Sequence, residues 1–477
     1  MLKLFNTLSR KLELFKPLKL KKVRMYSCGP TVYNYVHLGN LRAYIFVDLL
    51  KRYLRYRGFV VKHVMNITDV DDKTIRDSKK NNKSLKEFTD FYLNAFLEDL
   101  KLMNVELPDI MPRATEHINE MVALIKQLLD KGYAYKANGS IYYKISKCLN
   151  YGKLAQINRQ DLKKGAGRKL VTSDDYKKEE VNDFVLWKAW QPEDGNVFWD
   201  TKIGRGRPGW HIECSAMSMK YLGKSFDIHT GGTDLIFPHH TNEIAQSEAV
   251  TGKKFVKYWL HNAHLIVDGK KMSKSLNNFY TLRDVLKKEY NPLILRLILL
   301  RTHYQQILNF SFKEFKEARS IFKNFLDFLL DLDLITNKNQ EGLNIDEKII
   351  KNRNAFKKAM DNDLNISLAL AIIFDFIKDL NKNIKLLDIK QVKTIKQYIF
   401  EIDSVFGFIS PLYKQYQKDI NKLLKNAKIK ELLDKRKKMR KDGNYKRADE
   451  IRDMLLKKGL VVNDTEEGYN VRLLHFP

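Results

Sequence analysis

The stretch from residue 24 to residue 58 restricts the fold more than any other part of this chain. It opens with the apolar run Met25 to Cys28, breaks at Gly29-Pro30, and becomes a helical pattern after His37-Leu38-Gly39-Asn40. A second apolar and β-branched run, Phe59 to Met65, comes next. Strand, helix and strand in this order predict a βαβ unit, and hence a parallel sheet that binds ligands at the carboxyl ends of its strands.

His37 and Gly39 lie where this helix would begin. The first turn of a helix offers free backbone N–H groups and the positive end of the helix dipole, and a histidine adds a mobile hydrogen-bond donor. Phosphate is the ligand that such a site favours. An ordinary loop histidine and a turn glycine would explain these residues equally well, so the interpretation needs support from elsewhere in the chain.

That support comes from Gly269-Lys270-Lys271-Met272-Ser273-Lys274-Ser275, which follows the apolar run Leu265 to Val267. The pattern predicts a flexible cationic loop at the end of a strand. Together with the upstream HLGN, it resembles the KMSKS and HIGH signatures that flank the triphosphate of ATP in class I aminoacyl-tRNA synthetases. The resemblance implies catalytic roles for His37, Asn40, Lys271 and Lys274, and ATP binding by these four residues with Gly39 and Ser273. Asn40 replaces the last histidine of HIGH, so it can donate a neutral hydrogen bond but cannot carry a proton.

The bulk properties restrict the partners and the compartment. The 477 residues include 86 Lys and Arg against 57 Asp and Glu, which gives a formal net charge of +29. This charge suits nucleic acid, although a compositional bias toward lysine would produce it as well. Three cysteines cannot build a disulfide framework, and no apolar stretch is long enough to cross a bilayer. We therefore expect a cytoplasmic protein without a membrane partner, with the basic residues 1 to 20 as part of the fold.

Polar residues and glycines recur at the ends of the expected strands. Thr68 follows the second strand, and Phe226 to His229 predicts a third strand with Thr230 to Asp234 as the loop at its end. In that loop, Gly231 and Gly232 would allow a nucleotide to approach the backbone closely, and Asp234 would accept hydrogen bonds from ribose hydroxyls. The chain contains no Walker A sequence.

One expected helix carries two candidate metal ligands. His239 and Glu243 are four residues apart and would share a face of a helix beginning near Pro238. Such a pair can hold a zinc ion, but it is more often an ordinary surface contact. Cys28 ends the first strand and Cys214 lies near the start of the second half, so a doubly wound sheet would bring both thiols toward one cleft. Their separation in sequence is not a diagnostic metal-ligand spacing.

Three motifs are similar to the cysteinyl-tRNA synthetase family: Cys28-Gly29-Pro30-Thr31-Val32-Tyr33, the run Arg207 to Met217 containing Pro208-Gly209-Trp210-His211-Ile212-Glu213-Cys214, and Phe237-Pro238-His239-His240 with Asn242 to Gln246. The resemblance implies one zinc ion per chain, held by Cys28, Cys214, His239 and Glu243. It implies an amino-acid pocket lined by Gly29, Thr68, Trp210 and His229, with core packing as the competing explanation for Trp210. The implied activity is cysteine–tRNA ligation by a monomer, with L-cysteine, ATP with Mg²⁺, and tRNA(Cys) as substrates.

A metal would solve a specific problem of recognition. Serine and cysteine differ by one atom, and a shape-matched pocket separates such isosteres by only about 1–3 kcal/mol. Zinc prefers a thiolate to a hydroxyl and lowers the pKa of a thiol from about 8.5. Four protein ligands usually mark a closed structural site. We therefore expect the substrate sulfur to add as a fifth ligand, or Glu243 to yield its place.

The chain divides into six expected segments. A Rossmann-like doubly wound parallel α/β domain occupies 1–112 and 204–260, split by an inserted domain at 113–203, and the KMSKS loop with a stem-contact region follows at 261–310. An all-α helical-bundle domain for tRNA is expected at 311–425, and a small basic anticodon-binding unit at 426–477. Basic residues beside an aromatic ring suit an unpaired base, so the predicted tRNA contacts are Arg436, Arg440, Tyr445 and Arg452. Tyr445 stands where the family more often has tryptophan, and a solvated helix face would explain this run as well.

Two rival functions remain open at this level. A cysteine ligase could use the same adenylate chemistry with an amino-sugar acceptor, but a small acceptor would not need the basic helical third of the chain. A zinc-stabilised RNA-binding protein with a degenerate active site would not need His37 or the intact loop from Lys271 to Ser275.

Overall fold

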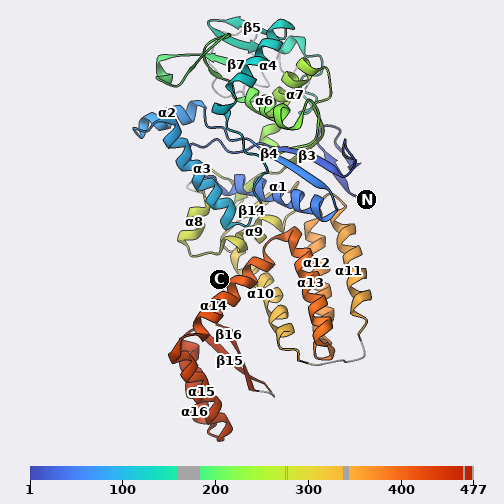
Figure 1. Cartoon of the computed structure of the whole chain (residues 1–477), viewed down its shortest axis with the longest axis vertical. Coiled ribbons are helices and arrows are strands. Elements are labelled where there is room, and N and C mark those ends of the chain that lie inside the picture. The colour runs from blue at the N-terminus through green and yellow to red at the C-terminus, as the bar shows by residue number, and fades with distance from the viewer. Residues whose placement is uncertain (158–182, 274–275, 277, 337–342, 466–467, 475–477) are drawn as a thin grey trace.

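The computed structural model describes residues 1–157, 183–273, 276, 278–336, 343–465 and 468–474. Figure 1 shows an elongated molecule with a β-rich domain at one end, a parallel sheet with its helices next to it, and a helical bundle below. The C-terminal helices and hairpin form the opposite tip.

The centre of the catalytic half is a four-stranded parallel sheet in the order β11-β10-β3-β4. Its strands are β3 (Lys22–Ser27), β4 (Val60–Met65), β10 (Phe226–Gly232) and β11 (Val256–Asn262). The two middle strands come from the two halves of the chain, so their carboxyl ends bring distant segments together. The prediction of a parallel doubly wound fold is confirmed. A hairpin of β1 (Lys3–Asn6) and β2 (Lys11–Leu14) adds the N-terminal residues to the fold.

Helices α1 (Leu38–Tyr56), α2 (Asp72–Lys80) and α3 (Leu85–Leu102) follow the first two strands of this sheet. The side chain of His37 caps α1, because its Nδ1 accepts a hydrogen bond from the backbone N–H of Asn40 at 3.3 Å. Leu41, Ile45 and Leu49 lie on one stripe of α1 and are buried, as their spacing predicts. The strand–loop–helix pattern therefore delivers His37 to the first turn of a helix beside the sheet.

The inserted segment forms its own antiparallel sheet in the order β5-β6-β7-β9-β8. Its elements are α4 (Ile118–Asp130), β5 (Ala134–Ala137), β6 (Ser140–Tyr143), β7 (Phe184–Ala189), β8 (Trp199–Thr201) and β9 (Gly204–Pro208). The sequence pattern predicts that residues 204–208 begin the second catalytic half, but β9 pairs with β7, with Lys188 opposite Arg207. The second half therefore resumes at α6 (Trp210–Leu222).

Of two local details around the predicted cleft, one differs from expectation and one agrees with it. Gly231 and Gly232 lie in β10 rather than in a loop, because they pair with His261 and Asn262 of β11. The helix expected near Pro238 is present: η6 (Ile236–His240), which follows η5 (Thr233–Leu235), is interrupted by extended backbone angles at Phe237, and the turn after it continues into α7 (Thr241–Thr251) with Pro238 at its start. Helix α7 still contains Glu243 in its first turn.

A small three-stranded sheet, ordered β13-β12-β14, carries the second motif. It consists of β12 (Leu265–Val267), β13 (Lys270–Lys271) and β14 (Leu308–Phe310), and α8 (Leu282–Lys287) and α9 (Pro292–Leu300) lie between the last two strands. The predicted strand before the cationic loop is confirmed.

The last third is helical, as its sequence pattern predicts. A bundle contains α10 (Glu314–Asp333), α11 (Ile345–Met360), α12 (Ile366–Asn381), α13 (Ile389–Phe406) and α14 (Ile409–Leu424). The C-terminal unit contains α15 (Ala427–Lys441), α16 (Tyr445–Lys457), β15 (Leu460–Thr465) and β16 (Gly468–Leu473). The apolar core of α1 continues into the bundle, whereas the C-terminal unit has a small core of its own around Ile429, Leu433 and Leu455. In the described part of the chain, each helix is too short or too polar to cross a bilayer.

Candidate active site and metal centre

Four side chains from four separate elements converge at the carboxyl end of the parallel sheet. Cys28 follows β3, Cys214 lies on α6, His239 lies in η6 and Glu243 lies on α7. One ligand atom of each residue, namely the two cysteine Sγ atoms, a ring nitrogen of His239 and a carboxylate oxygen of Glu243, lies within 4.8 Å of the other three. Cys214, His239 and Glu243 are buried, and Cys28 is half-buried. The structure thus brings together the four residues that the sequence resemblance assigns to zinc.

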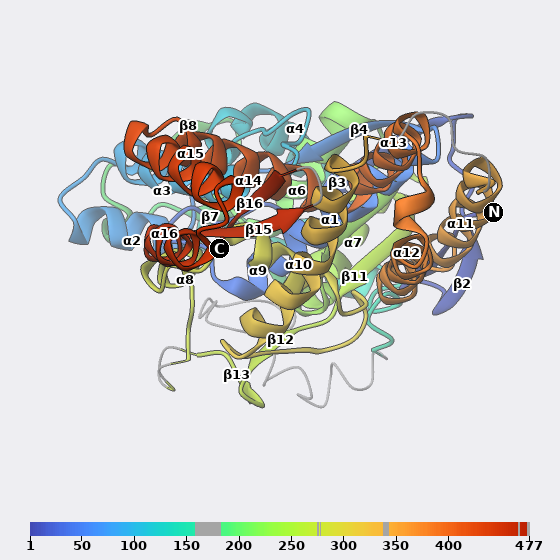
Figure 2. The same ribbon diagram turned by 90° about the horizontal axis from the view of Figure 1, so that it is seen from below.

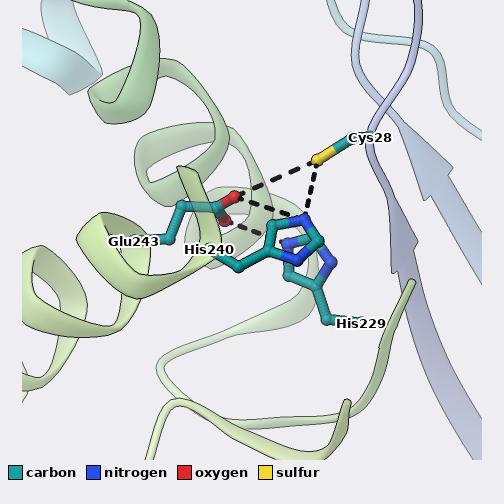
Figure 3. Close-up of side chains that lie close together, drawn as sticks. All are labelled: Cys28, His229, His240 and Glu243. Atoms are coloured by element: carbon teal, nitrogen blue, oxygen red, sulfur yellow. Dashed lines mark hydrogen bonds and ion pairs between the residues drawn. The ribbon is translucent and has the colours of Figure 1, made fainter. Parts of the chain in front are cut away.

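A second group of potential ligands overlaps the first. Cys28 and Glu243 also lie within 4.8 Å of His229 and His240 (Figure 3). His240 Nε2 lies 3.3 Å from Cys28 Sγ, and His229 Nε2 lies 2.9 Å from Glu243 Oε2. Zinc binds thiolate sulfur readily, and the set with two cysteines offers two such ligands. The set with two cysteines is therefore the better fit for zinc, and His229 and His240 contact its carboxylate and one of its thiols.

Further hydrogen bonds hold the candidate ligands in place. His239 Nε2 lies 3.1 Å from Glu243 Oε1, while its Nδ1 lies 2.8 Å from Nδ1 of His211. One of these two Nδ1 atoms must donate and the other accept, and a tautomer with His239 Nδ1 as the donor leaves Nε2 able to bind a metal. His240 is braced in turn by His261, whose Nε2 lies 2.7 Å from His240 Nδ1.

The charges within the cluster favour a bound cation. Burial raises the pKa of the Cys28 thiol well above its usual range. The pKa of Cys214 falls to about 6 against the opposing effect of burial, because Cys28 donates a hydrogen bond to it and His239 lies alongside. Despite burial, His229 and His239 lower the pKa of Glu243 to about 2. A thiolate and a carboxylate buried together are costly unless a proton or a metal ion neutralises them.

The donor set fits zinc on this chemistry. Two sulfurs, one imidazole nitrogen and one carboxylate oxygen are all ligands that zinc accepts. The hydroxyl of Tyr26 supports the same conclusion, because it is fully buried in the same apolar cluster as Cys28 and Cys214, and Cys214 interacts with it. A buried hydroxyl donor beside two sulfurs suits a thiolate that a metal keeps ionised.

The predicted amino-acid pocket residues surround the cluster. Thr68 Oγ1 donates a hydrogen bond of 2.9 Å to Glu213 Oε2 and accepts one of 3.1 Å from Asn66 Nδ2. A Cβ atom at Gly29 would lie 1.7 Å from the carbonyl oxygen of Asn66, so only glycine fits there. Trp210 is 40% exposed, which argues against a core role, and its ring centroid lies 4.3 Å from that of His239.

The two signature motifs meet in space. Leu38 N donates to Tyr280 O at 2.9 Å, and the His37 ring contacts that of Phe279 at a centroid distance of 5.2 Å. A Cβ atom at Gly39 would lie only 2.9 Å from His37 Cε1 and 3.5 Å from Met272 Cε. The first turn of α1 is therefore packed against the loop that follows Lys271. Burial lowers the pKa of His37, although Asp234 opposes this effect, so a neutral imidazole faces the cleft.

The cationic loop is anchored by a residue that the sequence interpretation did not single out. Asn278 donates to Lys271 O at 3.1 Å and accepts from Ser273 N at 2.8 Å. Lys271 is exposed at the end of β13. Lys274 and Ser275 lie outside the described residues, so the roles predicted from them stay predictions.

Asp234 and the two glycines lie between the cluster and His37. Asp234 acts on the pKa of both Cys28 and His37, which places its carboxylate near both parts of the site. A Cβ atom at Gly231 would lie 2.7 Å from the His240 ring, and one at Gly232 would lie 2.3 Å from Asp234 Oδ1. The contact with the buried His240 ring therefore leaves no room for a side chain at Gly231, whereas at Gly232 the exposed Asp234 side chain could turn aside.

Comparison with known proteins agrees with this arrangement. The model of the tRNA synthetases class I (C) catalytic domain matches residues 14–320, a DALR domain matches 355–410, and the cysteinyl-tRNA ligase anticodon binding domain matches 426–472. The Cysteine--tRNA ligase of Brachyspira hyodysenteriae is 46% identical, over 97% of this chain and 98% of that protein. The chain belongs to the cysteine–tRNA ligase family. The Cysteine--tRNA ligase of Protochlamydia amoebophila is 43% identical, over 99% of this chain and 98% of that protein.

Solved structures support the fold of this cysteine–tRNA ligase family member. Mycobacterium tuberculosis methionyl-tRNA synthetase in complex with methionyl-adenylate matches with a TM-score of 0.58 at 14% identity, and the match covers 83% of this chain and 91% of that chain. At this identity, the likeness shows the class I synthetase fold alone. An amino-sugar acceptor finds no support, because the family match extends to the anticodon binding domain.

The four predicted tRNA contacts of the C-terminal unit differ in exposure. The Arg436 side chain is fully buried and forms two hydrogen bonds of 2.9 Å with the carboxylate of Asp464. It therefore serves the packing of the unit and does not reach its surface. Tyr445 is 60% exposed, and the Arg440 guanidinium lies 5.4 Å from the centre of its ring. Arg452 is exposed on α16 and pairs with Asp449 at 3.1 Å.

Sequence reasoning missed several residues that shape the site. Four of them contact the predicted residues directly: His211, Glu213, His240 and Asn278. The first two lie beside Cys214 in the quoted motif, and His240 is adjacent to His239, so proximity in sequence was the available signal. Their partners lie in other elements, which no local pattern indicates.

Proposed function

We propose that this cysteine–tRNA ligase activates L-cysteine with ATP in the cleft between Cys28 and His37, and transfers the cysteinyl group to the 3′ end of tRNA(Cys). The observation that carries the proposal is the convergence of Cys28, Cys214, His239 and Glu243 near the junction of the two signature motifs. The four converging side chains offer ligands for a thiophilic metal, and the two signature motifs offer hydrogen-bond donors for a triphosphate.

We propose that Cys28, Cys214, His239 and Glu243 would hold one zinc ion. When bound, zinc supplies a Lewis acid that binds a thiolate in preference to a hydroxyl. Glu243 has a second partner in His229, which can hold the Glu243 carboxylate if that carboxylate leaves the metal. Thr68, oriented by Glu213, and Trp210 would position the rest of the amino acid.

In the proposed first step, a carboxylate oxygen of cysteine bonds to the α-phosphorus of ATP. The bond between that phosphorus and the oxygen shared with the β-phosphate breaks. The products are cysteinyl-adenylate and pyrophosphate. His37 and the N–H groups of the first turn of α1 would donate to the phosphates on one side, and Lys271 and Lys274 would neutralise charge on the other. Removing one such donor typically raises the barrier by about 3–4 kcal/mol.

In the second step, the terminal ribose hydroxyl of the tRNA attacks the carbonyl carbon of the adenylate, and AMP leaves. This route needs no nucleophile from the protein. Gly231, Gly232 and Asp234 would hold the adenosine, and Mg²⁺ would accompany the ATP. Arg440, Tyr445 and Arg452 remain the proposed tRNA contacts of the C-terminal unit. We expect the enzyme to act as a monomer in the cytoplasm.

The decisive experiment combines substrate selection with metal analysis. We expect exchange between ATP and labelled pyrophosphate to depend on cysteine, and to prefer cysteine over serine by more than the roughly 200-fold that pocket shape alone allows. The purified protein should contain zinc, which Cys214→Ser should lose. Cys148→Ser is the matched control, because Cys148 lies outside the cluster, and it should keep both the metal and the exchange activity.

Two results would contradict the proposal. Equal exchange with serine would disprove metal-based selection, even if the enzyme class stands. Zinc content unchanged in Cys214→Ser would disprove the ligand assignment. Loss of zinc from His240→Ala would then support the overlapping ligand group.

A further inference from the structure

A basic, aromatic pocket lies outside the site described above, at the start of α10. It has a volume of about 490 Å³ and is lined by Tyr290, Phe312, Lys313, Lys316 and Arg319. We call it the α10 pocket. Tyr290 precedes α9, Phe312 follows β14, and Lys316 and Arg319 lie on the first turns of α10. Volumes of this size accommodate small molecules or a single nucleotide.

The positive charge of the α10 pocket is not compensated locally. Lys313, Lys316 and Arg319 are exposed, and the ion pairs of the described residues include none of them. The nearby glutamates of α10, Glu314 and Glu317, are both turned to Arg301. A cluster of free cations with no acidic lining residue attracts an anion.

Aromatic rings form the floor of the α10 pocket. Tyr290 stacks on the buried Phe315 at a centroid distance of 4.0 Å and on Phe312 at 5.7 Å. Tyr290 and Phe312 are half-buried, so each keeps part of its surface exposed. Arg319 lies 5.5 Å from the centre of the Tyr290 ring, and Lys288 lies 5.0 Å from that of Phe312. Rings and cations side by side are the combination that binds an unpaired base together with its phosphate.

The larger pocket beside α3 lacks this character. It has a volume of about 800 Å³ and includes Arg283, but Arg283 pairs with Glu98 at 2.7 Å and with Asp99 at 3.0 Å. The charge of Arg283 is therefore neutralised within the protein, and Lys101 shares the lining with the carboxylate of Glu98, so this pocket carries no comparable signal for an anion.

The α10 pocket lies between the active-site loop and the C-terminal unit. Strand β14, which leads into Phe312, pairs with β12, which leads into the loop of Lys271. At its other end, α10 contacts the C-terminal hairpin, because Arg472 of β16 pairs with Asp327 and Asp331. A helix of 20 residues spans about 30 Å. Figure 2 shows α10 with the C-terminal unit on one side and β12 and β13 on the other.

We propose that the α10 pocket binds the tRNA between its acceptor end and its anticodon, with the cations on the phosphate backbone and the half-buried rings of Tyr290 and Phe312 against an unpaired nucleotide. This inference rests on the proposed function. A tRNA that reaches the cleft with its 3′ end and the C-terminal unit with its anticodon would bridge the two regions that α10 connects, and the uncompensated cations lie at the start of α10.

The test is a charge reversal, Lys316→Glu with Arg319→Glu. Its matched control is Lys351→Glu with Lys358→Glu, which makes the same charge change at exposed lysines of α11. Affinity for transcribed tRNA(Cys) is measured at several salt concentrations, beside cysteine-dependent ATP–pyrophosphate exchange without tRNA. We expect the pocket variant to bind tRNA at least tenfold more weakly, with the slope of log Kd against log salt reduced by about 1–2. Exchange activity should be unchanged in both variants.

A second variant, Phe312→Leu, removes a ring while keeping the charges. It should weaken tRNA binding by about fivefold or more and leave the salt slope unchanged. If the pocket variant and the α11 control bind tRNA equally well while exchange is intact, the α10 pocket is not a tRNA site. If the unmodified protein shows no cysteine-dependent exchange, the proposed function fails, whatever the binding result.

Discussion

Arginines of the C-terminal unit show how the surroundings decide the role of a side chain. Arg436, Arg440 and Arg452 carry the same charge on neighbouring helices. Arg436 is buried and held in a fork by Asp464, whereas Arg440 and Arg452 are 38% and 47% exposed. A desolvated guanidinium with a bidentate partner contributes to the fold, whereas Arg440, which also pairs with Asp464 at 2.9 Å, and Arg452 keep solvent-exposed surface that RNA can reach.

Replacing Arg436 by alanine should loosen the C-terminal unit. The change removes both hydrogen bonds to Asp464 and leaves a void in a small core, which should cost about 2–3 kcal/mol of local stability. Amide hydrogen exchange across α15, α16 and the β15–β16 hairpin measures this directly. Arg452→Ala should leave exchange protection unchanged and weaken tRNA binding instead. Equal protection in the two variants would contradict the structural role of Arg436.

At the scale of elements, the contact between α3 and α8 fixes the segment that follows the cationic loop. Arg283 of α8 reaches Asp99 of α3, whose carboxylate oxygens are buried and lack a well-aligned hydrogen bond among the described residues. Burial raises the pKa of Asp99 to about 6, with an opposing effect from Arg283 and a smaller upward one from Glu98. The folded protein therefore holds a proton on Asp99 more tightly than the unfolded chain does.

This raised pKa predicts that the free energy of unfolding falls as the pH rises. Below about pH 4 the carboxyl is protonated in both states, and as the pH rises through about 6 the folded state must accommodate a buried charge. Asp99→Asn should match the unmodified protein near pH 4 and exceed its stability at pH 8 by about 1–2 kcal/mol, after allowing for partial screening. Thermal unfolding at both pH values measures the difference. Glu98→Gln, at a more exposed position, should show no such divergence; a less stable Asp99→Asn at pH 8 would contradict the prediction.

At the scale of the whole molecule, α1 joins the active site to the helical bundle. His37 caps its first turn, and farther along the helix the fully buried Asp48 pairs with the fully buried Arg296 of α9. Arg296 also donates to the carbonyl oxygens of Met103, Asn104 and Phe406, the last at the end of α13. One guanidinium thus connects three helices and a loop, which makes the catalytic fold and the bundle a single packed body.

Arg296→Met should therefore destabilise the whole protein. It leaves Asp48 buried with only Arg52 as its ionic partner among the described residues, a change that typically costs about 3–5 kcal/mol. Denaturant unfolding followed by circular dichroism measures the loss. Arg301→Met, which breaks a partly exposed pair with Glu314 and Glu317, should cost about 1 kcal/mol or less. The double variant Asp48→Leu with Arg296→Met should recover part of the loss, and a double variant no better than the single one would contradict this interpretation.

The sequence predicted the features that depend on neighbouring residues. The strand before Cys28, the helix from Leu38 and the helical last third all follow from the spacing of apolar side chains over a few positions. The HLGN and Lys271 motifs were recognisable because each is continuous in the chain. The family resemblance added the four metal ligands, which spacing alone could not have selected.

Only the tertiary structure decided which distant residues meet and which are buried. Cys28 lies 215 positions from Glu243, yet their atoms are 4.0 Å apart, because parallel strands from the two halves of the chain are adjacent in one sheet. The same packing brings His211 against His239, assigns β9 to the inserted sheet and places Arg436 inside a core. Local pattern determines secondary structure through contacts a few residues apart, whereas a site depends on the register and packing of segments far apart in the chain.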